Sequence, residues 1–510
     1  MMASHTTLPE KFVELQNAKV TRRNSNPKIQ RVPEHLRNRE NVKEHYLPKL
    51  VSIGPIHHGK ENLKLGEKYK LVWAAQYIEN AGLNSWNLYN KIVLKIDELK
   101  ALFAEDVITA TGESLNGFGS LDEKLSWILF LDECSLLHIV ADNVYLKDDQ
   151  LGIVMMDVLL LENQIPLDVL YLLWNNEDAS KNELVDIMKD FLKCHQWAKP
   201  AKATKLKDTW RSRLQYYQDT IKKFITSGFA VQKEEEHGPP ISISRPTHLL
   251  DLQRRMILDI KFLRGTNPPF GRRIVQRTSH LHSDQQVIPL NDYLMEIRQI
   301  RLYRNKNRGQ EISERNEISD ENTKMITYRN IQDLRAVGIK LKSSGTRRLT
   351  DIDFSEGWFT AKLTLPEIVV DDNTAASFLN LIAYEMCPDF ENDYGICSFA
   401  VFMDSLIDHP EDVMELRSKE ILLNCLGSDE EVADLFNIMS TNLLPNTKIY
   451  YEVRAKIQKH YRNKCKTWIA LGKHTYFNNP WAFIAFLAAF IALALTFIQT
   501  WFAINPTENK

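Results

Sequence analysis

The sequence predicts a mainly α-helical body with a small β-hairpin, followed by one transmembrane helix near the carboxyl terminus. Three observations carry this prediction. Apolar residues recur at helical spacing over most of the body, residues 349–370 alternate apolar and polar side chains, and the stretch Trp481–Ala503 contains no charged residue. A chain of 510 residues with 44% hydrophobic and 25% charged residues can bury a large core.

The amino-terminal part of the body, residues 31–225, is predicted to be helical after a flexible segment at 1–30. A lead-in rich in Pro, Gly and His comes first and favours loops. Helical periodicity then places helices at about 68–81, 85–104, 121–140 and 152–174. Ser120 and Glu123 have the spacing of a capping box at the start of the third helix, and Pro166 interrupts the fourth.

Residues 226–325 differ in composition from the rest of the body. An acidic run at Glu234–Glu236 and two proline pairs are followed by many arginines and lysines after Arg298. Segments with this composition bury little apolar surface. We expect a charged, partly disordered insertion here.

The second part of the body, residues 326–474, is predicted to be helical with a small hairpin. The hairpin lies within 349–370 and turns at Ser355–Gly357. Helices are expected at about 375–387, 396–408, 410–426, 429–440 and 447–471. Ser428 and Glu431 have capping-box spacing before the fourth of these, and the last is strongly basic.

The membrane span is predicted at residues 480–503, with a short tail at 504–510. The 23 uncharged residues Trp481–Ala503 extend about 34 Å as a helix, enough for a hydrocarbon core of about 30 Å. Trp481 and Trp501 stand near the two ends, where aromatic rings favour the headgroup level. A buried core helix of this length normally has a polar face, so the bilayer is the expected partner of this segment.

The charges beside the span predict its orientation. Between Lys448 and Lys473 there are eight basic residues and one acid, Glu452, whereas the tail carries only Glu508 and Lys510. The positive-inside rule therefore places the body in the cytosol, at the plasma membrane or an endomembrane, as in a tail-anchored, single-pass protein. The basic juxtamembrane residues can also contact anionic lipids. They are Arg454, Lys456, Lys459, Arg462, Lys464, Lys466 and Lys473.

Composition excludes several function classes. The formal net charge of −2 gives no global attraction to nucleic acid, and the arginines after Arg254 have no interleaved aromatic residues, so no nucleic-acid partner is expected. Six scattered cysteines without a C-x-x-C pair argue against a zinc site or a disulfide scaffold.

Short segments along nearly the whole chain carry a resemblance to a known family. They are Val32–Leu36, Tyr46–Gly59, Asp157–Pro166, His248–Leu252, Leu334–Lys340, Ala400–Ile407, Gly427–Phe436 and Asn479–Trp481. In these segments, and in this order, the chain resembles a plant family known only as domain of unknown function 247. The resemblance implies a largely helical plant protein with a carboxyl-terminal anchor and no established enzymatic activity. It also implies a link to the self-incompatibility loci of grasses, where similar members are implicated as pollen-side determinants.

Four histidines fall within 24 residues, from His35 to His58, and the adjacent pair His57 and His58 are the candidate metal ligands. Their spacing differs from that of a helical zinc motif, and no carboxylate or cysteine recurs at ligand spacing. We therefore favour a turn in which these imidazoles bond to backbone groups. Neither a metal nor another cofactor is expected.

Glu162, Asn163 and Gln164 lie inside an apolar run that ends at Pro166. A buried carboxylate here could have a raised pKa and act as a catalytic group. The favoured interpretation is that these side chains satisfy backbone groups where the proline removes a helical donor.

The function predicted from the sequence is a non-enzymatic, membrane-tethered recognition or signalling protein that binds an unidentified protein partner. No P-loop, G-x-S-x-G elbow or dinucleotide fingerprint is present in the sequence. The alternative is a membrane-bound enzyme with a site near Glu162 or His57. A pocket in which these groups converge would favour the enzyme, whereas buried polar groups and an exposed patch would favour binding.

Membrane topology is the first testable prediction. In sealed microsomes, protease added outside should digest the region before Pro480, and a glycosylation acceptor on an extension after Lys510 should receive sugar. The cause is the cost of moving charge into the bilayer, about 2.5 to 3.5 kcal/mol per Lys or Arg at its centre. A protease-protected body with an unglycosylated extension would contradict the prediction.

Overall fold

The computed structural model describes most of the body and the carboxyl-terminal helix. The described residues are 12–13, 27–39, 42–141, 148–174, 181–195, 245–258, 330–345, 348–357, 361–390, 394–441, 443, 445–446, 449–462 and 480–504.

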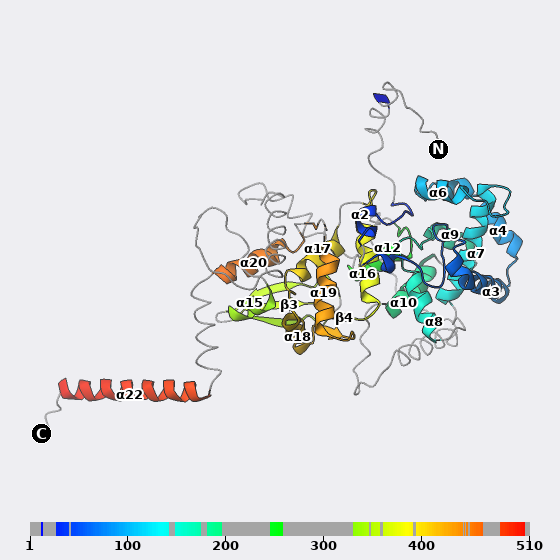
Figure 1. Cartoon of the computed structure of the whole chain (residues 1–510). Coiled ribbons are helices and arrows are strands. Elements are labelled where there is room, and N and C mark those ends of the chain that lie inside the picture. Colours follow the sequence, from blue (N-terminus) through cyan, green and yellow to red (C-terminus); the bar gives the residue numbers. More distant parts are fainter. Residues whose placement is uncertain are drawn as a thin grey trace, which may run out of the picture. The chain divides into compact units, whose positions relative to one another are not determined.

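The chain forms two compact units, each containing residues from two parts of the sequence (Figure 1). Unit 1 contains Met1–Arg254 and Leu379–Asp393. Unit 2 contains Arg255–Phe378 and Tyr394–Lys510. The mainly α-helical fold class is confirmed, with small sheets in unit 2.

Unit 1 is built around helix α7, which is rich in apolar residues between Leu125 and Val140 and is buried over most of its length. A helix that is buried on nearly all sides needs neighbours on those sides, and α3, α4, α5, α6, α9 and α10 contact α7. The helices of this unit are α2 (Glu34–Arg37), α3 (Lys64–Asn80), α4 (Ser85–Val93), α5 (Ile96–Lys100), α6 (Glu105–Gly112), α7 (Leu121–Ala141), α8 (Asp148–Asp157), α9 (Leu167–Leu173), α10 (Lys181–His195), most of α12 (Leu249–Ile257), part of α16 (Thr374–Glu385) and the 3-10 turns η1 (Lys43–Tyr46) and η2 (Glu61–Leu63).

The lead-in, residues 27–59, has little regular structure yet is largely buried from Val51 to His57. Its first residues pair with the α5–α6 connection: Ile29 N–H donates to Leu102 O at 2.9 Å, and Ala104 N–H donates to Ile29 O at 2.9 Å. Gly66 lets the lead-in cross α3 closely, because a Cβ at this position would lie 2.0 Å from Leu50 O. Backbone therefore contacts backbone at this crossing.

The described residues of unit 2 contain two small sheets. The first has the order β1-β3-β2, with β1 (Ile339–Ser343) parallel and β2 (Asp353–Glu356) antiparallel to β3 (Ala361–Leu365). The second pairs β4 (Ile368–Val370) with β5 (Leu422–Asn424) in parallel.

In unit 2, every residue of α17 (Gly395–Asp404) is buried, and this helix packs against α19 (Asp429–Ser440). The described part of the unit also contains the helices α15 (Ile331–Ala336), α18 (Pro410–Ser418), α20 (Tyr451–Arg462) and α22 (Pro480–Ile504). Ser428 caps α19 as predicted, with its Oγ accepting from Glu431 N at 3.1 Å.

The predicted hairpin is confirmed as β2 and β3, but the turn predicted at Ser355–Gly357 is wrong, because Ser355 and Glu356 belong to β2 and pair with β3. Strands β1 and β5 lie outside the predicted range 349–370 and were missed, and the separate pairing of β4 was not predicted. The helix predicted at 410–426 ends at Ser418 because Glu420 has a φ of 56°, after which β5 pairs with β4. The helix predicted at 85–104 is broken into α4 and α5. The fourth predicted helix, 152–174, breaks at Asp157 rather than at Pro166.

The range predicted to be a partly disordered insertion, 226–325, contains α12, whose leucines are buried. The other residues of this range, apart from 245–258, lie outside the described part of the chain, as does most of the predicted flexible segment 1–30. The basic helix predicted at 447–471 is described as α20, which ends at Arg462.

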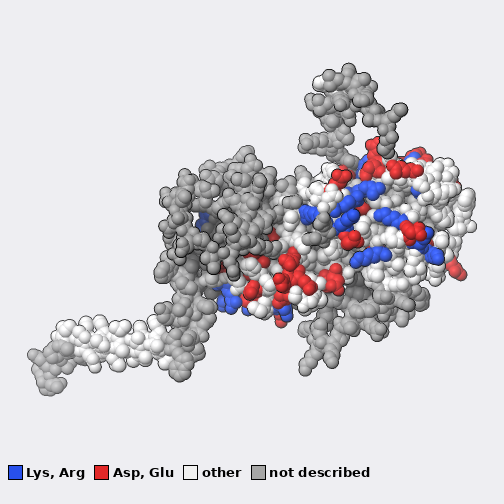
Figure 2. Space-filling model, in the orientation of Figure 1, with Lys and Arg blue, Asp and Glu red and all other residues white. Residues whose placement is uncertain are grey.

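The carboxyl-terminal helix α22 is long and apolar enough to cross a membrane. Its most apolar window, Ile484–Trp501, has a mean hydropathy of 2.0 and none of it is buried against the rest of the chain. The face of this helix seen in Figure 2 carries no Lys, Arg, Asp or Glu, and the sequence of the helix contains none.

The close crossing at Gly66 predicts a marked cost for one methyl group. Gly66→Ala should lower the free energy of unfolding by about 1–3 kcal/mol, because backbone atoms must move to admit the Cβ. Gly152→Ala in α8 is the matched control. No atom lies within 4 Å of its Cβ position, so the better helix propensity should stabilise by up to about 1 kcal/mol. If Gly66→Ala and Gly152→Ala had equal thermal denaturation midpoints, the close contact between the backbones of α3 and the lead-in would be contradicted.

Candidate functional site

The last residue of α8 and the segment that follows it, up to α9, carry four polar side chains that are almost fully buried. Asp157, Glu162, Asn163 and Gln164 are each exposed by 2% or less. The helix ends at Asp157, and the next begins after Pro166, which is the N-cap of α9. Between them the backbone forms turns, in which Leu160 N–H donates to Asp157 O at 3.3 Å and Asn163 N–H donates to Leu160 O at 3.1 Å.

Asp157 holds the middle of the lead-in. Its carboxylate accepts hydrogen bonds from three consecutive backbone N–H groups, those of Lys49, Leu50 and Val51, at 2.9, 2.7 and 2.8 Å. Burial raises the pKa of Asp157, and the three backbone donors oppose that rise.

Asn163 continues this attachment. Its Oδ1 accepts from Ile53 N at 2.6 Å, and its Nδ2 donates to Val51 O at 2.9 Å and to Asp157 O at 2.8 Å. One buried amide therefore joins the lead-in to the end of α8.

Gln164 and Asn380 also join separate parts of the chain through hydrogen bonds to backbone groups. Gln164 Nε2 donates to Leu160 O at 2.8 Å, and its Oε1 accepts from Leu250 N at 3.1 Å, at the start of α12. Asn380, in the part of α16 that belongs to unit 1, accepts from Leu161 N at 2.8 Å and donates to His45 O at 2.9 Å.

Glu162 gathers three donors from the lead-in. Its Oε1 accepts from Val32 N at 2.8 Å and forms an ion pair with Arg37, while its Oε2 lies 3.1 Å from His57 Nε2. Both Glu162 and His57 are 2% exposed. The two positions that the sequence singled out separately are therefore neighbours in the structure.

His57 is neutral in this arrangement. Burial, and then the positive charges of Lys60, Arg31 and Arg37, lower its pKa to about 3. Its Nδ1 lies 2.7 Å from Lys60 Nζ, which can only donate, so the ring proton is assigned to Nε2, which faces Glu162.

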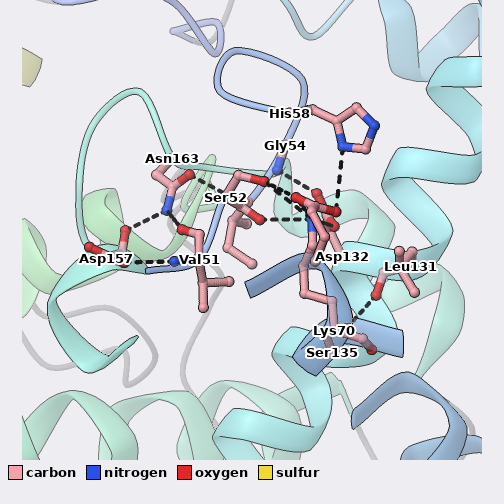
Figure 3. A network of polar contacts seen from close by, with 12 residues as sticks. Val51, Ser52, Gly54, His58, Lys70, Leu131, Asp132, Ser135, Asp157 and Asn163 are labelled. Atoms are coloured by element: carbon pink, nitrogen blue, oxygen red, sulfur yellow. Dashed lines mark hydrogen bonds and ion pairs between the residues drawn. The ribbon is translucent and has the colours of Figure 1, made fainter. Parts of the chain in front are cut away.

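A second buried network lies where the lead-in crosses α3 and α7 (Figure 3). The Lys70 ammonium, which is fully buried, donates to Asp132 and to Ser52 O at 2.9 Å, and lies 3.0 Å from Glu67 Oε1. With three acceptors for three protons, Lys70 is a satisfied cation.

Asp132 completes this network from α7. Its Oδ2 accepts from Gly54 N at 2.8 Å, while its Oδ1 pairs with Lys70. Burial raises the pKa of Asp132 to about 6, against the opposing charge of Lys70. Gly54 has a φ of +79°, and a Cβ there would lie 2.6 Å from Gln164 O, so glycine fits this contact.

The neighbouring Glu133 is a different case. Its side chain is fully buried, and within the described part of the chain neither carboxyl oxygen has a hydrogen-bond partner. Burial, and then the charge of Asp132, raise its pKa well above the ordinary value. The protonated form is therefore favoured.

Ser52 and Lys70 have the atom types of a serine–lysine catalytic pair, with Lys70 Nζ 3.3 Å from Ser52 Oγ. In this arrangement Lys70 has no free lone pair to act as a base, and Ser52 Oγ donates to Glu67 Oε1 at 2.5 Å. Both side chains are fully buried. The pair is arranged to fix the lead-in rather than to attack a substrate.

The two candidate metal ligands point to different partners. His57 lies between Lys60 and Glu162, whereas His58 Nδ1 lies 3.8 Å from Glu67 Oε2. Burial, and then the charge of Lys70, lower the pKa of His58 to about 4. Over the described residues, no group of three or more His, Cys, Asp or Glu side chains is placed to hold a metal.

Sequence reasoning missed Lys70 and Asp132. A signal was present: Lys70 occupies the same helical face as the buried Trp73, Ala74 and Tyr77, and the acids at 132 and 133 interrupt the apolar run of α7. A charge on an apolar face indicates a buried partner, but the sequence does not say which one.

The predicted basic juxtamembrane residues separate into two groups. Arg454 is buried, with its guanidinium 5.4 Å from the centre of the Phe402 ring. Lys456, Lys459 and Arg462 are exposed on α20. The remaining three, Lys464, Lys466 and Lys473, lie outside the described residues.

Comparison with known proteins gives a family match over most of the chain. The family DUF247, described as "Plant protein of unknown function", matches residues 29–495. The chain is similar to UPF0481 protein At3g47200 of Arabidopsis thaliana, 24% identical over 91% of this chain and 84% of that protein. It is also similar to the putative UPF0481 protein At3g02645 of the same plant, 24% identical over 89% and 86%. No solved structure matches significantly.

The depressed pKa of His57 predicts acid sensitivity. Because the folded pKa is about 3 and the ordinary value is 6.5, the unfolded chain binds more protons between these pH values, and stability is lost as pH falls below 6.5. Between pH 7 and pH 5 the wild-type chain should lose about 2 kcal/mol more than His57→Gln, whose amide can keep both contacts. Denaturant unfolding at both pH values measures this difference. If the wild-type chain and His57→Gln lost the same free energy of unfolding between pH 7 and pH 5, the prediction would be wrong.

Proposed function

We propose that this chain, which belongs to the DUF247 family of plant proteins of unknown function, is a membrane-tethered recognition protein whose body binds a protein partner. In this proposal α22 spans the bilayer and the body lies on the cytosolic side. The polar groups of unit 1 hold the fold together, and an exposed aromatic surface makes the contact with the partner.

The aromatic surface carries the proposal. It consists of Trp86 and Tyr89 on α4 and Trp127 and Phe130 on α7. Successive rings are in contact, with centroids 5.8 Å apart for Trp86–Tyr89, 5.9 Å for Tyr89–Phe130 and 5.8 Å for Trp127–Phe130. Phe130 is buried and supports the others, whereas Trp86 is 67% exposed and Trp127 36% exposed.

Exposed tryptophans of this kind are costly in water and are common at the energetic centres of protein interfaces. Other apolar side chains of unit 1 are exposed as well, namely Leu65, Leu71 and Val72 on α3 and Leu94 after α4.

The burial of Glu162 and His57 supports a binding function rather than an enzymatic one. An enzyme that used Glu162 or His57 would need to bring substrate to side chains that are 2% exposed and already held by lead-in residues. We therefore do not propose the enzymatic alternative. We also do not extend the proposal to self-incompatibility, because no residue of the aromatic surface bears on that role.

The membrane part of the proposal rests on α22 and its flanking charge. The helix is uncharged, and exposed Lys456, Lys459 and Arg462 on α20 belong to the basic stretch before it. Basic residues are enriched on the cytosolic side of spans. The same three side chains can approach anionic lipid headgroups.

The aromatic surface predicts a specific loss of partner binding. Trp86→Ser should remove the partner from the proximity-labelling pattern of the full-length, membrane-anchored chain in its own tissue, because truncating an interface hot spot costs about 2–4 kcal/mol. The melting temperature should change little, since Trp86 is mostly exposed.

Met414→Ser is the matched control, because Met414 is 58% exposed but lies on α18 of unit 2. This variant should keep the labelling pattern. Labelled proteins that are the same for the wild-type chain and for Trp86→Ser would contradict the proposed surface.

A further inference from the structure

Three cationic side chains of the lead-in gather around the buried His57–Glu162 pair. Arg37 pairs with Glu162, and Lys60 Nζ lies 2.7 Å from His57 Nδ1 on the other side of the imidazole. Arg31 precedes Val32, whose backbone N–H binds the same Glu162 carboxylate. In Figure 2, Lys and Arg side chains gather over the position of α2, the helix that carries Arg37.

These cations interact unfavourably with one another. Burial, and then the charges of Arg31 and Arg37, lower the pKa of Lys60; burial, and then the charge of Arg31, lower the pKa of Arg37. Glu34 and Asp106 act in the opposite sense on Arg37. An anion placed among the three cations would relieve their repulsion.

The cations also keep hydrogen-bond donors available. Lys60 is exposed and, in the described part of the chain, forms no ion pair with a carboxylate, so two of its three ammonium protons face solvent. Among the described residues, Arg31 contacts the carboxylate of Asp106 at 3.5 Å, and the side chain of Asp106 is 60% exposed. The Arg37 guanidinium has five N–H donors, more than its contact with Glu162 can use.

The buried pair makes this a built site rather than a loose surface cluster. His57 accepts from Lys60 while facing Glu162, and Glu162 in turn holds Arg37. Two flexible cationic side chains are therefore held by groups that are 2% exposed. Fixed donors lose less rotamer entropy when a ligand binds.

We propose that Arg31, Arg37 and Lys60 bind a phosphomonoester group, as carried by a phosphorylated inositol, either free or as a lipid headgroup. A phosphomonoester has about two negative charges and three acceptor oxygens, which match two guanidinium forks and one ammonium. A single carboxylate would leave part of this donor set unused. The site is separate from the aromatic surface and does not depend on the proposed protein partner.

The test uses the full chain in nanodiscs of phosphatidylcholine and a phosphate-free buffer. Inositol trisphosphate is titrated by calorimetry into wild-type chain, Lys60→Gln, Arg31→Gln and Lys95→Gln. Saturable binding is expected for the wild-type chain, weakened about tenfold or more in each of the first two variants. Lys95→Gln, which removes an exposed lysine paired with Glu98, should bind within about twofold of wild type.

The two variants have different neighbours, so the test does not depend on either one folding. In Lys60→Gln the amide can still donate to His57, and Arg31→Gln breaks only an exposed contact. A second arm repeats the wild-type titration in nanodiscs that contain phosphatidylinositol bisphosphate. Weaker apparent binding in that arm identifies the lipid headgroup as the occupant, and unchanged binding identifies the free ligand.

Two results would overturn the proposal. One is the absence of saturable binding of inositol trisphosphate to the wild-type chain in phosphatidylcholine nanodiscs. The other is an equal loss of affinity in Lys60→Gln, Arg31→Gln and Lys95→Gln, which would mean that only overall charge matters.

Discussion

Unit 1 depends on one constraint: a lead-in without regular secondary structure is buried, and its backbone groups need partners. A buried unpaired N–H or C=O group costs about 1–3 kcal/mol. Side chains of the segment after α8 meet this need, with Asp157 serving Lys49 to Val51 and Asn163 serving Val51 and Ile53. Glu162 does the same for Val32. These bonds act as a set, because each one holds the chain in position for the next.

Buried charge adds specificity to this attachment. The Lys70–Asp132 pair joins α3 to α7 and, through Gly54, to the lead-in, while Arg254 Nε lies 2.7 Å from Glu385 Oε1, joining α12 to α16. Replacing a whole buried pair by apolar residues is often tolerated, whereas removing one partner costs about 3–5 kcal/mol. Such pairs therefore favour one arrangement over others. The same contacts place Arg37 and Lys60 beside His57, so the fold and the proposed phosphate site share residues.

The sequence predicted features that depend on local pattern and missed those that depend on distant partners. Composition indicated α22, and capping residues indicated α7 and α19. Asn163 does bond to backbone groups, but to those of Val51, Ile53 and Asp157 rather than to groups that Pro166 leaves without a helical donor. The helix break at Asp157 was missed because residues 158–161 are apolar and the bonds that replace the helix come from the lead-in, more than 100 residues away. Strands β4 and β5 were missed for a similar reason, because parallel pairing leaves no turn signal between them. The exposed aromatic surface on α4 and α7 was not predicted, since the exposure of a side chain depends on how the helices pack.

Hydrogen exchange at the backbone amide of Ile53 tests the central claim most directly, because that amide donates to Asn163 Oδ1 in a fully buried site. In Asn163→Leu the side chain keeps a similar size but loses the acceptor. The account predicts faster exchange at Ile53 and at the neighbouring amides of Leu50 and Val51, together with a lower melting temperature, while amides in the middle of α17 in unit 2 keep their protection. Unchanged exchange from Leu50 to Ile53 in this variant would contradict the claim that the segment after α8 holds the lead-in.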